Sequence, residues 1–280
     1  MESLQEALCR TAAWKAPGFD GVFGFFVKKV TALHEPLVKV FTKILNDERT
    51  HPFPAWFTTG RTVLIPKNRK KHLLADDNAR PINCLPGLYK LLTKTIEMGI
   101  ANALDRVLTD EQKGCRSRVF GAQHQLIIDR VLTEQDQETT KDLAQVWLDM
   151  RKAFDSLSHH WILRVLSDYG IDQRVVHTIK RLSEQWRTVL TADGRVISDP
   201  IPIRRGIFQG DSLSPILFIT ALNPLSWYIQ KRSEGIIAGN GRKINHLLFV
   251  DDWKLFGKKK EEVESLGSEV ERLSDASVSS

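Results

Sequence analysis

Three aspartates follow apolar segments in positions that could bring them together in one site. Asp251 and Asp252 separate two mainly apolar runs, 247–250 and 253–256, and Asp149 ends a third such run. Adjacent acids at a hairpin tip repel each other and replace the preferred Asn-Gly, although aspartate tolerates the left-handed backbone of such turns. An isolated Asp-Asp pair is most simply an exposed hairpin tip. We predict that Asp251 and Asp252 form a two-residue turn, and the presence of Asp149 favours a chemical role as well.

Carboxylates placed side by side at the ends of two strands favour divalent cations. If both strands belong to one sheet, Asp149 and Asp251 face each other across neighbouring strands. Hard oxygen ligands select Mg²⁺ or Mn²⁺. Two such ions roughly 3.5–4 Å apart would activate a 3′-hydroxyl and neutralise a leaving pyrophosphate. We therefore predict nucleotidyl transfer, with Asp149, Asp251 and Asp252 as catalytic residues and metal ligands and two Mg²⁺ ions as cofactors, Mn²⁺ being an alternative.

Basic side chains near two other strand ends could bind the phosphates of such a substrate. A basic run, Lys67–Lys71, directly follows one predicted strand, and Arg80 begins the next. Cations at these places could contact a triphosphate. For Arg69, Lys70 and Lys71 an ordinary solvated charge run is the better interpretation, so Lys67 and Arg80 are the candidates for nucleotide binding.

Three further residues are candidates for contacts with a nucleotide. Gln209 and Gly210 precede a predicted helix start, and glycine there permits close approach of the backbone to a nucleic-acid strand. Taken alone, Gln-Gly is only a turn. Phe154, five residues after Asp149, is either a core residue or a ring that lies under the nucleotide sugar and excludes a 2′-hydroxyl.

Apolar periodicity indicates an α+β protein in which helices lead and an acid-bearing sheet follows. An Asp193-Gly194 hairpin turn, an Asp172 helix N-cap and a helix start at Ser214-Pro215 mark element boundaries, and Pro224 is expected to kink or end that last helix. The predicted helices cover 23–33, 37–45, 88–107, 161–169, 172–186, 216–231 and 263–273. The predicted strands cover 61–66, 80–82, 145–148, 188–191, 195–198, 247–250 and 253–256.

Composition excludes several classes of protein but names no function. The 280 residues include 40 Lys plus Arg and 34 Asp plus Glu, a difference of 40 − 34 = +6, and 42% are hydrophobic. This is typical of a soluble globular chain that tolerates a polyanionic partner. The longest apolar stretch, 215–225, is too short to cross a bilayer, and the N-terminal residues lack the pattern of a secretory signal. The three cysteines, Cys9, Cys84 and Cys115, form neither a zinc pattern nor a disulfide framework, which favours a reducing, intracellular compartment.

Taken together, these motifs resemble a reverse transcriptase, most of all the enzymes of non-long-terminal-repeat (LINE-like) retrotransposons. The resemblance runs from about Trp14 to Phe256. The sequence around Ser226 and around His246 is similar to that of the site-specific branch of these elements. Any one motif is weak, but six in the family's order are a strong signal. The motifs are Trp14–Gly21, Val63–Lys67 with Ala79–Ile82 and Tyr89-Lys90, Glu111–Cys115, Leu148–Ser156, Arg205–Phe218 and Phe249–Asp252.

The resemblance implies a right-hand polymerase with fingers in residues 1–140 and a palm in residues 141–280. Its antiparallel palm sheet would pack on helices, and the thumb would be absent because the sequence stops about one helix after Asp252. The resemblance implies that Lys67 and Arg80 bind the triphosphate and that Phe154 selects the sugar. It also implies that Gln209 and Gly210 contact the nascent base pair and the template.

The family copies RNA into DNA, so the implied partners are an RNA template, a DNA primer or nicked target DNA, and dNTPs, with no membrane. A nuclear location is implied by the resemblance alone, and the oligomeric state is not predicted. Phe19 replaces the usual proline of its motif, and the segment from Cys115 to Gln125 matches the family imperfectly, so no role is assigned there.

Two alternative functions stay open from the sequence. A catalytically inert nucleic-acid-binding remnant would keep the basic surface without turnover. An RNA-dependent RNA polymerase shares the palm, but it usually has aspartate where Phe154 stands and glycine where Val250 stands, so it ranks lower.

Overall fold

The computed structural model describes residues 2–47, 51–68, 70, 78–116, 119–139, 142–150, 152–239 and 241–279. Arg69 and Lys71 of the basic run, and Arg151 of the Leu148–Ser156 motif, lie outside the described residues.

The chain divides into two compact units, each made of two separate segments. Unit 1 combines Met1–Ile100 with Leu166–Ser214, and unit 2 combines Ala101–Val165 with Pro215–Ser280. Each unit thus includes a later stretch of the chain, and the division into fingers (residues 1–140) and palm (residues 141–280) stays a prediction.

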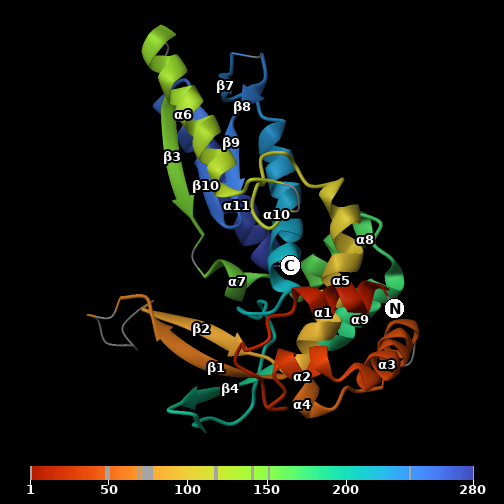
Figure 1. Ribbon diagram of the computed structural model, residues 1–280. Coiled ribbons are helices and arrows are strands. Elements are labelled where there is room, and N and C mark those ends of the chain that lie inside the picture. The colour runs from red at the N-terminus through yellow and green to blue at the C-terminus, as the bar shows by residue number, and fades with distance from the viewer. Residues whose placement is uncertain are drawn as a thin grey trace. The chain divides into compact units, whose positions relative to one another are not determined.

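Unit 1 combines helices with a mixed sheet (Figure 1). Strand β1 pairs antiparallel with β2, in the register Ile65↔Arg80, and parallel with β4, while β5 and β6 pair antiparallel with β4. Its strands are β1 (Thr59–Pro66), β2 (Ala79–Cys84), β4 (Arg187–Ala192), β5 (Arg195–Val196) and β6 (Ile201–Pro202). Its helices are α1 (Glu2–Arg10), α2 (Gly24–Lys29), η1 (Thr31–Leu33), α3 (His34–Asn46), α4 (Ala55–Thr58), α9 (Gln173–Ser183) and most of α5 (Gly87–Asp105).

Unit 2 is built around an antiparallel sheet in the order β3-β10-β9, with helices against it (Figure 1). Helix α11 packs against β10 and β3, and α6 packs against β9. The strands are β3 (Ala144–Asp149), β7 (Ile236–Ile237), β8 (Lys243–Ile244), β9 (His246–Phe249) and β10 (Asp252–Gly257). The helices are α6 (Ala122–Thr139), α7 (Ala153–Ser156), α8 (His159–Asp168, its last residues in unit 1), α10 (Ser214–Gln230) and α11 (Lys260–Ser279).

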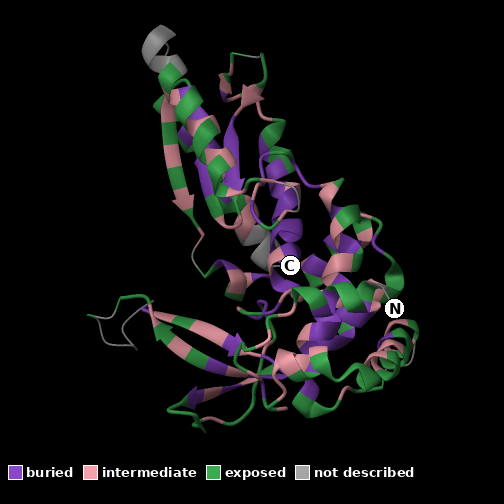
Figure 2. Cartoon of the chain, in the orientation of Figure 1, coloured by how far each residue is buried: buried purple, intermediate pink, exposed green. Residues whose placement is uncertain are grey.

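The core of unit 2 lies on the face of the sheet that α10 and α11 cover. Leu248, Trp253 and Leu255 are almost fully buried there, together with Leu225 of α10 and Leu266 of α11. Burying side chains of this size stabilises the fold by about 1.5–3 kcal/mol each. Helix α10 is buried along most of its length, as its apolar composition predicts (Figure 2). Its sequence thus specifies an interior helix behind the sheet.

Most of the predicted elements are confirmed, with local differences at prolines. Asp172 caps α9 by accepting a hydrogen bond from the Arg174 backbone N–H. Helix α10 begins at Ser214 but continues through Pro224 to Gln230, so Pro224 does not end it. Helix α3 begins at His34 and places Pro36 in its first turn, where the missing N–H costs nothing.

Cys9, Cys84 and Cys115 are free thiols. Within the described part of the chain, no helix has the length and apolar character needed to cross a bilayer.

Candidate active site

The three candidate carboxylates lie at one end of the β3-β10-β9 sheet of unit 2. Asp149 is the last residue of β3, Asp252 is the first residue of β10, and the two are direct partners in the antiparallel register. Asp252 also pairs with Phe249 of β9, so the hairpin turn consists of Val250 and Asp251. The prediction that Asp251 and Asp252 form the turn is therefore wrong by one residue: Asp252 belongs to the ladder, where it faces Asp149.

These carboxylates lie on the face of the sheet opposite the α10–α11 core. Side chains alternate along a strand, so Asp252 shares a face with Lys254, whereas Trp253 points into the core. Asp149 shares that face with Trp147, which is 64% exposed. Asp149 and Asp252 are exposed and Asp251 is half-buried, so a substrate can reach all three.

The negative charges at this end of the sheet lack a cationic partner among the residues that the structure describes. Burial raises the pKa of Asp251, its own backbone N–H opposes that rise, and the negative charges of Asp252 and Asp149 add to it. Among the described residues, no cationic side chain forms an ion pair with any of the three. A concentration of negative charge without a partner is suited to a bound cation.

The fit to a divalent metal is that of an open site. Among the residues that the structure describes, no group of three or more His, Cys, Asp or Glu side chains is placed so that it could hold a metal ion, and this includes the three aspartates. Mg²⁺, however, is usually held by one or two carboxylates, and substrate phosphates and water complete its coordination. The facing pair Asp149 and Asp252, with Asp251 beside them, supplies the donor chemistry that Mg²⁺ prefers.

An apolar groove of about 190 Å³ opens on the same face of unit 2. Leu126 of α6, Trp147 and Phe249 line it, and Asp252 stands among its lining residues. Lys254 also lines the groove, but its ammonium is paired with Asp129 and lies 4.7 Å from the centroid of the Trp147 ring. The groove therefore presents a wide aromatic surface next to a carboxylate.

Phe154 is in unit 2 with the carboxylates. It lies in α7, the short helix that follows β3, and its ring stacks on Phe218 of α10 with centroids 4.7 Å apart and planes 6° apart. Phe218 is fully buried, whereas Phe154 is half-buried. One face of the Phe154 ring thus joins the core, and sugar selection by this residue stays a prediction.

Lys67 and Arg80 belong to unit 1, at one end of the β1–β2 pair. Arg80 lies opposite Ile65 in the register, and Lys67 follows two residues later, so all three are expected on the same face. The Lys67 backbone N–H donates to the Asn78 carbonyl at 2.7 Å, which closes the ladder at this end. Both cationic side chains are exposed, so the structure brings together the two residues that the sequence singled out.

Gln209 and Gly210 lie beside the other end of β2 in unit 1. The Gln209 carbonyl accepts a hydrogen bond from the Asn83 backbone N–H at 2.8 Å. Gly210 has φ +124°, and a Cβ there would lie 2.7 Å from the Asn83 carbonyl oxygen. The glycine is therefore explained by this close approach to β2, and contact with a nucleic acid stays a prediction.

Asp211, next in the chain, is a structural acid. It is buried, and its carboxylate accepts hydrogen bonds from the Thr93 hydroxyl at 2.6 Å and from the Ser212 backbone N–H at 2.7 Å. Burial raises the pKa of Asp211 to about 6, although these hydrogen bonds and the charge of Lys90 oppose the rise.

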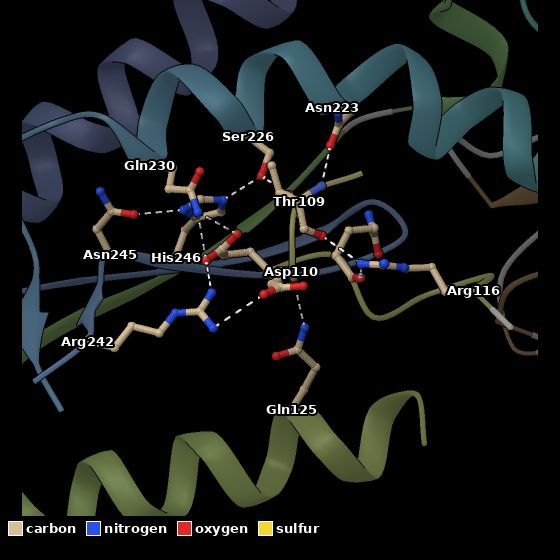
Figure 3. Close-up of polar contacts among 12 residues, drawn as sticks. Thr109, Asp110, Arg116, Gln125, Asn223, Ser226, Gln230, Arg242, Asn245 and His246 are labelled. Carbon is tan, nitrogen blue, oxygen red and sulfur yellow. Dashed lines mark hydrogen bonds and ion pairs between the residues drawn. The ribbon is translucent and has the colours of Figure 1, made fainter. Parts of the chain in front are cut away.

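Sequence reasoning missed a buried polar chain in unit 2 that joins α10 to the strand β9 (Figure 3). The Asn245 side-chain amide donates to the Ile229 carbonyl at 2.6 Å, so its oxygen accepts from His246 Nδ1 at 2.8 Å. His246 Nε2 then accepts from the Ser226 hydroxyl at 2.7 Å, and that hydroxyl accepts from Thr109 Oγ1 at 2.7 Å. Ser226, His246 and Asn245 each both donate and accept a hydrogen bond in this series.

The Ser226–His246–Asn245 order is similar to that of a hydrolytic triad, but burial excludes this role. Ser226 and His246 each have a relative exposure of 0%. Burial lowers the pKa of His246 to about 3, so the ring is neutral at ordinary pH. We conclude that this buried series of hydrogen bonds has a structural function. No spacing rule in the sequence indicates it, because its members come from three distant segments.

Comparison with known proteins places the chain in a family. Residues 65–277 match the family described as "Reverse transcriptase (RNA-dependent DNA polymerase)". The Pol polyprotein of a type-1 R2 retrotransposable element from Popillia japonica is 35% identical over 253 residues, which cover 89% of this chain and 34% of that protein. The corresponding type-2 protein, R2DM of Drosophila melanogaster, is 31% identical over 200 residues, 71% of this chain and 18% of that protein.

Solved structures show the same fold at low sequence identity. Apo telomerase from Candida Tropicalis, truncated from its C-terminal domain, aligns with a TM-score of 0.54 and 15% identity, covering 85% of this chain and 51% of that one. This likeness confirms a mixed α/β fold and carries no further meaning for function. The chain spans about a third of the length of the Popillia japonica relative. Because the family match covers most of the chain, the chain belongs to the reverse transcriptase (RNA-dependent DNA polymerase) family and is related to the Pol proteins of R2 retrotransposons.

Proposed function

We propose that this chain carries the nucleotidyl-transfer site of an RNA-directed DNA polymerase, with unit 2 as its palm and the β1–β2 region of unit 1 as part of its fingers. One observation supports this most strongly: Asp149 and Asp252 are direct cross-strand partners at an exposed sheet end, and Asp251 is in the adjoining turn. A protein gains nothing in stability from like charges placed directly opposite each other. Their retention is explained if a cation and a substrate complete the site.

In this proposal the side chains have distinct tasks. Asp149 and Asp251 are the principal ligands of Mg²⁺, and Asp252 adds a further carboxylate beside them. The bound metal would lower the pKa of the primer 3′-hydroxyl and neutralise charge on the leaving pyrophosphate. The half-exposed ring of Phe154 would lie under the deoxyribose and discriminate against a 2′-hydroxyl.

The residues of unit 1 bind the rest of the substrate. Lys67 and Arg80 would bind the triphosphate of the incoming dNTP, and their exposed positions at one end of the β1–β2 pair support that role. Gln209 and Gly210 would contact the nascent base pair and template. The template would be RNA and the primer a DNA 3′-end, with the nucleus as the site of action if that end belongs to target DNA.

The test is extension of a DNA primer on an RNA template by the purified chain with Mg²⁺ and dNTPs. The variants Asp149→Asn and Asp251→Asn should lose extension while they still bind the RNA–DNA duplex, because the amide keeps the shape but not the charge. If either variant extends the primer at the rate of the unaltered chain, the altered aspartate is not a catalytic metal ligand. Binding without extension by the unaltered chain, at any Mg²⁺ or Mn²⁺ concentration, would favour the inert remnant instead.

A further inference from the structure

The turn that carries Asp251 has a backbone conformation that its sequence does not favour. Val250 has φ +59°, whereas Asp251 is not in the positive-φ region. Two-residue hairpin turns with this pattern normally have glycine at the first position, because a β-branched side chain crowds the backbone there. Such conformations cost of order 1–3 kcal/mol and persist only where surrounding contacts impose them. Contacts from other parts of the chain must therefore hold Val250 in place.

One side chain binds both backbone groups of Val250. The Val250 N–H donates to Gln112 Oε1 at 3.0 Å, and Gln112 Nε2 donates to the Val250 carbonyl at 3.2 Å. The Gly114 N–H donates to the same Oε1 at 2.8 Å, which fixes the orientation of the amide. Gln112 is only 2% exposed, so water does not compete for these bonds.

Gly114 leaves the space in which the turn fits. A Cβ at this position would lie 2.6 Å from Val250 Cγ2 and 2.7 Å from the Val250 backbone nitrogen. Neither distance can be accommodated without moving the turn. The Glu111–Cys115 motif thus touches the acidic turn through both Gln112 and Gly114.

The segment that carries Gln112 is itself fixed along its length. Lys113 N–H donates to the Leu248 carbonyl, and Leu248 N–H donates to the Glu111 carbonyl, each at 3.0 Å, so the segment runs beside β9. Gln125 of α6 donates to the Glu111 carbonyl at 2.7 Å, and the Arg242 guanidinium contacts the Glu111 carboxylate at 2.8 Å.

The start of the segment is held equally firmly. The Thr109 backbone N–H donates to Asn223 Oδ1 at 2.8 Å, and Arg116 donates to the Thr109 carbonyl at 2.9 Å (Figure 3). The Thr109 hydroxyl begins the buried chain through Ser226 to His246. Gln112 is therefore presented to the turn from a rigid support, as positioning of a functional group requires.

We propose that Gln112 is a positioning residue for Asp251: by binding both backbone groups of Val250 it holds the strained turn in the conformation that places the Asp251 carboxylate beside Asp149 and Asp252. Gly114 assists by leaving room for Val250. The role of Asp251 in binding metal rests on the function proposed above. The proposal that Gln112 positions Asp251 does not depend on that function.

The experiment compares Gln112→Met with Gln123→Ala in the otherwise complete chain. Methionine keeps the length of the side chain and removes the amide, whereas Gln123 is an exposed glutamine on α6 of the same unit. In Gln112→Met, amide hydrogen exchange of the peptide spanning 249–252 should be about tenfold faster, the effect of losing roughly one hydrogen bond's worth of protection. kcat for primer extension should fall by at least the same factor, with the Kd for primer–template unchanged. Gln123→Ala should change neither, and equal exchange in the two variants would overturn the proposal.

A second substitution separates positioning from a general loss of stability. Glycine adopts a positive φ without strain, so Val250→Gly added to Gln112→Met should restore at least half of the lost kcat. A merely structural role for Gln112 would instead lower the urea midpoint and leave the kcat of the folded fraction unchanged, with no rescue by glycine. Either result, no rescue or an unchanged kcat, would overturn the proposal.

The two proposals fail in distinguishable ways. If the unaltered chain extends no primer, the proposed function fails, and the exchange measurement alone still decides whether Gln112 holds the turn.

Discussion

Two hairpin turns of this molecule have the same length and opposite chemistry. Asp193 and Gly194 join β4 to β5 with φ +49° and +75°, and both residue types accept the left-handed backbone. Val250 and Asp251 join β9 to β10, with the positive φ on a β-branched residue. The first turn forms from its own sequence, whereas the second depends on Gln112 and Gly114 from elsewhere in the chain. Strain that the surroundings must maintain is typical of functional sites, and here it coincides with the candidate carboxylates.

The largest difference between the turns should appear in catalysis. Asp251→Asn should lower the rate of primer extension about a thousandfold or more, since several kcal/mol of transition-state stabilisation depend on a charged metal ligand. Asp193→Asn, the matched change in the other turn, should leave the rate within about twofold, because asparagine suits a positive φ as well as aspartate does. Single-nucleotide extension under single-turnover conditions measures both. Equal losses in the two variants would mean that turn geometry, and not the carboxylate, matters.

Acidification should loosen the second turn and spare the first. The pKa of His246 is about 3 in the fold and ordinarily about 6.5, so the unfolded chain takes up a proton that the folded chain refuses. The stability contributed by neutral His246 is therefore complete above about pH 7 and is lost as the pH falls from 6.5 toward 3, amounting to about 2 kcal/mol by pH 5.

Hydrogen exchange at pH 7 and pH 5, corrected for the intrinsic pH dependence of exchange, measures this effect. Protection of residues 249–252 should fall on acidification, and protection of residues 192–195 should not. The variant His246→Gln should lack the pH-dependent part. If this variant and the unaltered chain lose protection equally, His246 is not the group responsible.

The smallest contrast concerns glycine at each turn. Gly194→Ala should lower the free energy of unfolding by about 1–2 kcal/mol, because alanine resists φ +75° although no atom lies within 4 Å of its Cβ. Val250→Gly should change that free energy by less than about 0.5 kcal/mol, because relief of strain offsets the added freedom of the unfolded chain. Urea denaturation at pH 7 gives both values. A loss above about 1 kcal/mol in Val250→Gly would show that Val250 is not strained.

The sequence predicts well those features that depend on neighbouring residues. Alternation and helical periodicity place the strands around Asp149 and Asp252, and the Asp193-Gly194 turn follows directly from its residue types. The predicted position of the acidic turn is off by one residue, because Asp-Asp is a better local turn sequence than Val-Asp, whereas Gln112 binds Val250 in the turn and Gly114 leaves room for it. The conformational preferences of neighbouring residues cannot predict a contact between residues more than a hundred positions apart, such as Gln112 and Val250.

Packing between distant segments is what the sequence leaves open. The buried chain through Thr109, Ser226 and His246 joins three separate segments, and none of its members stands out by spacing. The two compact units likewise each combine two segments that lie far apart in the sequence. The family resemblance, by contrast, is carried by short contiguous motifs and is confirmed by the family match over residues 65–277.

Binding of a divalent metal between Asp149 and the Asp251–Asp252 pair can be measured by Fe²⁺-directed cleavage of the chain. Fe²⁺ bound in place of Mg²⁺, with ascorbate and peroxide, generates hydroxyl radicals that cut the backbone close to the metal. A metal bound at this place should give two cuts, one near residue 149 and one near residue 251. Both should be suppressed by excess Mg²⁺, lost in Asp251→Asn and retained in Asp193→Asn. Cuts elsewhere, or cuts at these places that survive in Asp251→Asn, would contradict metal binding between these aspartates.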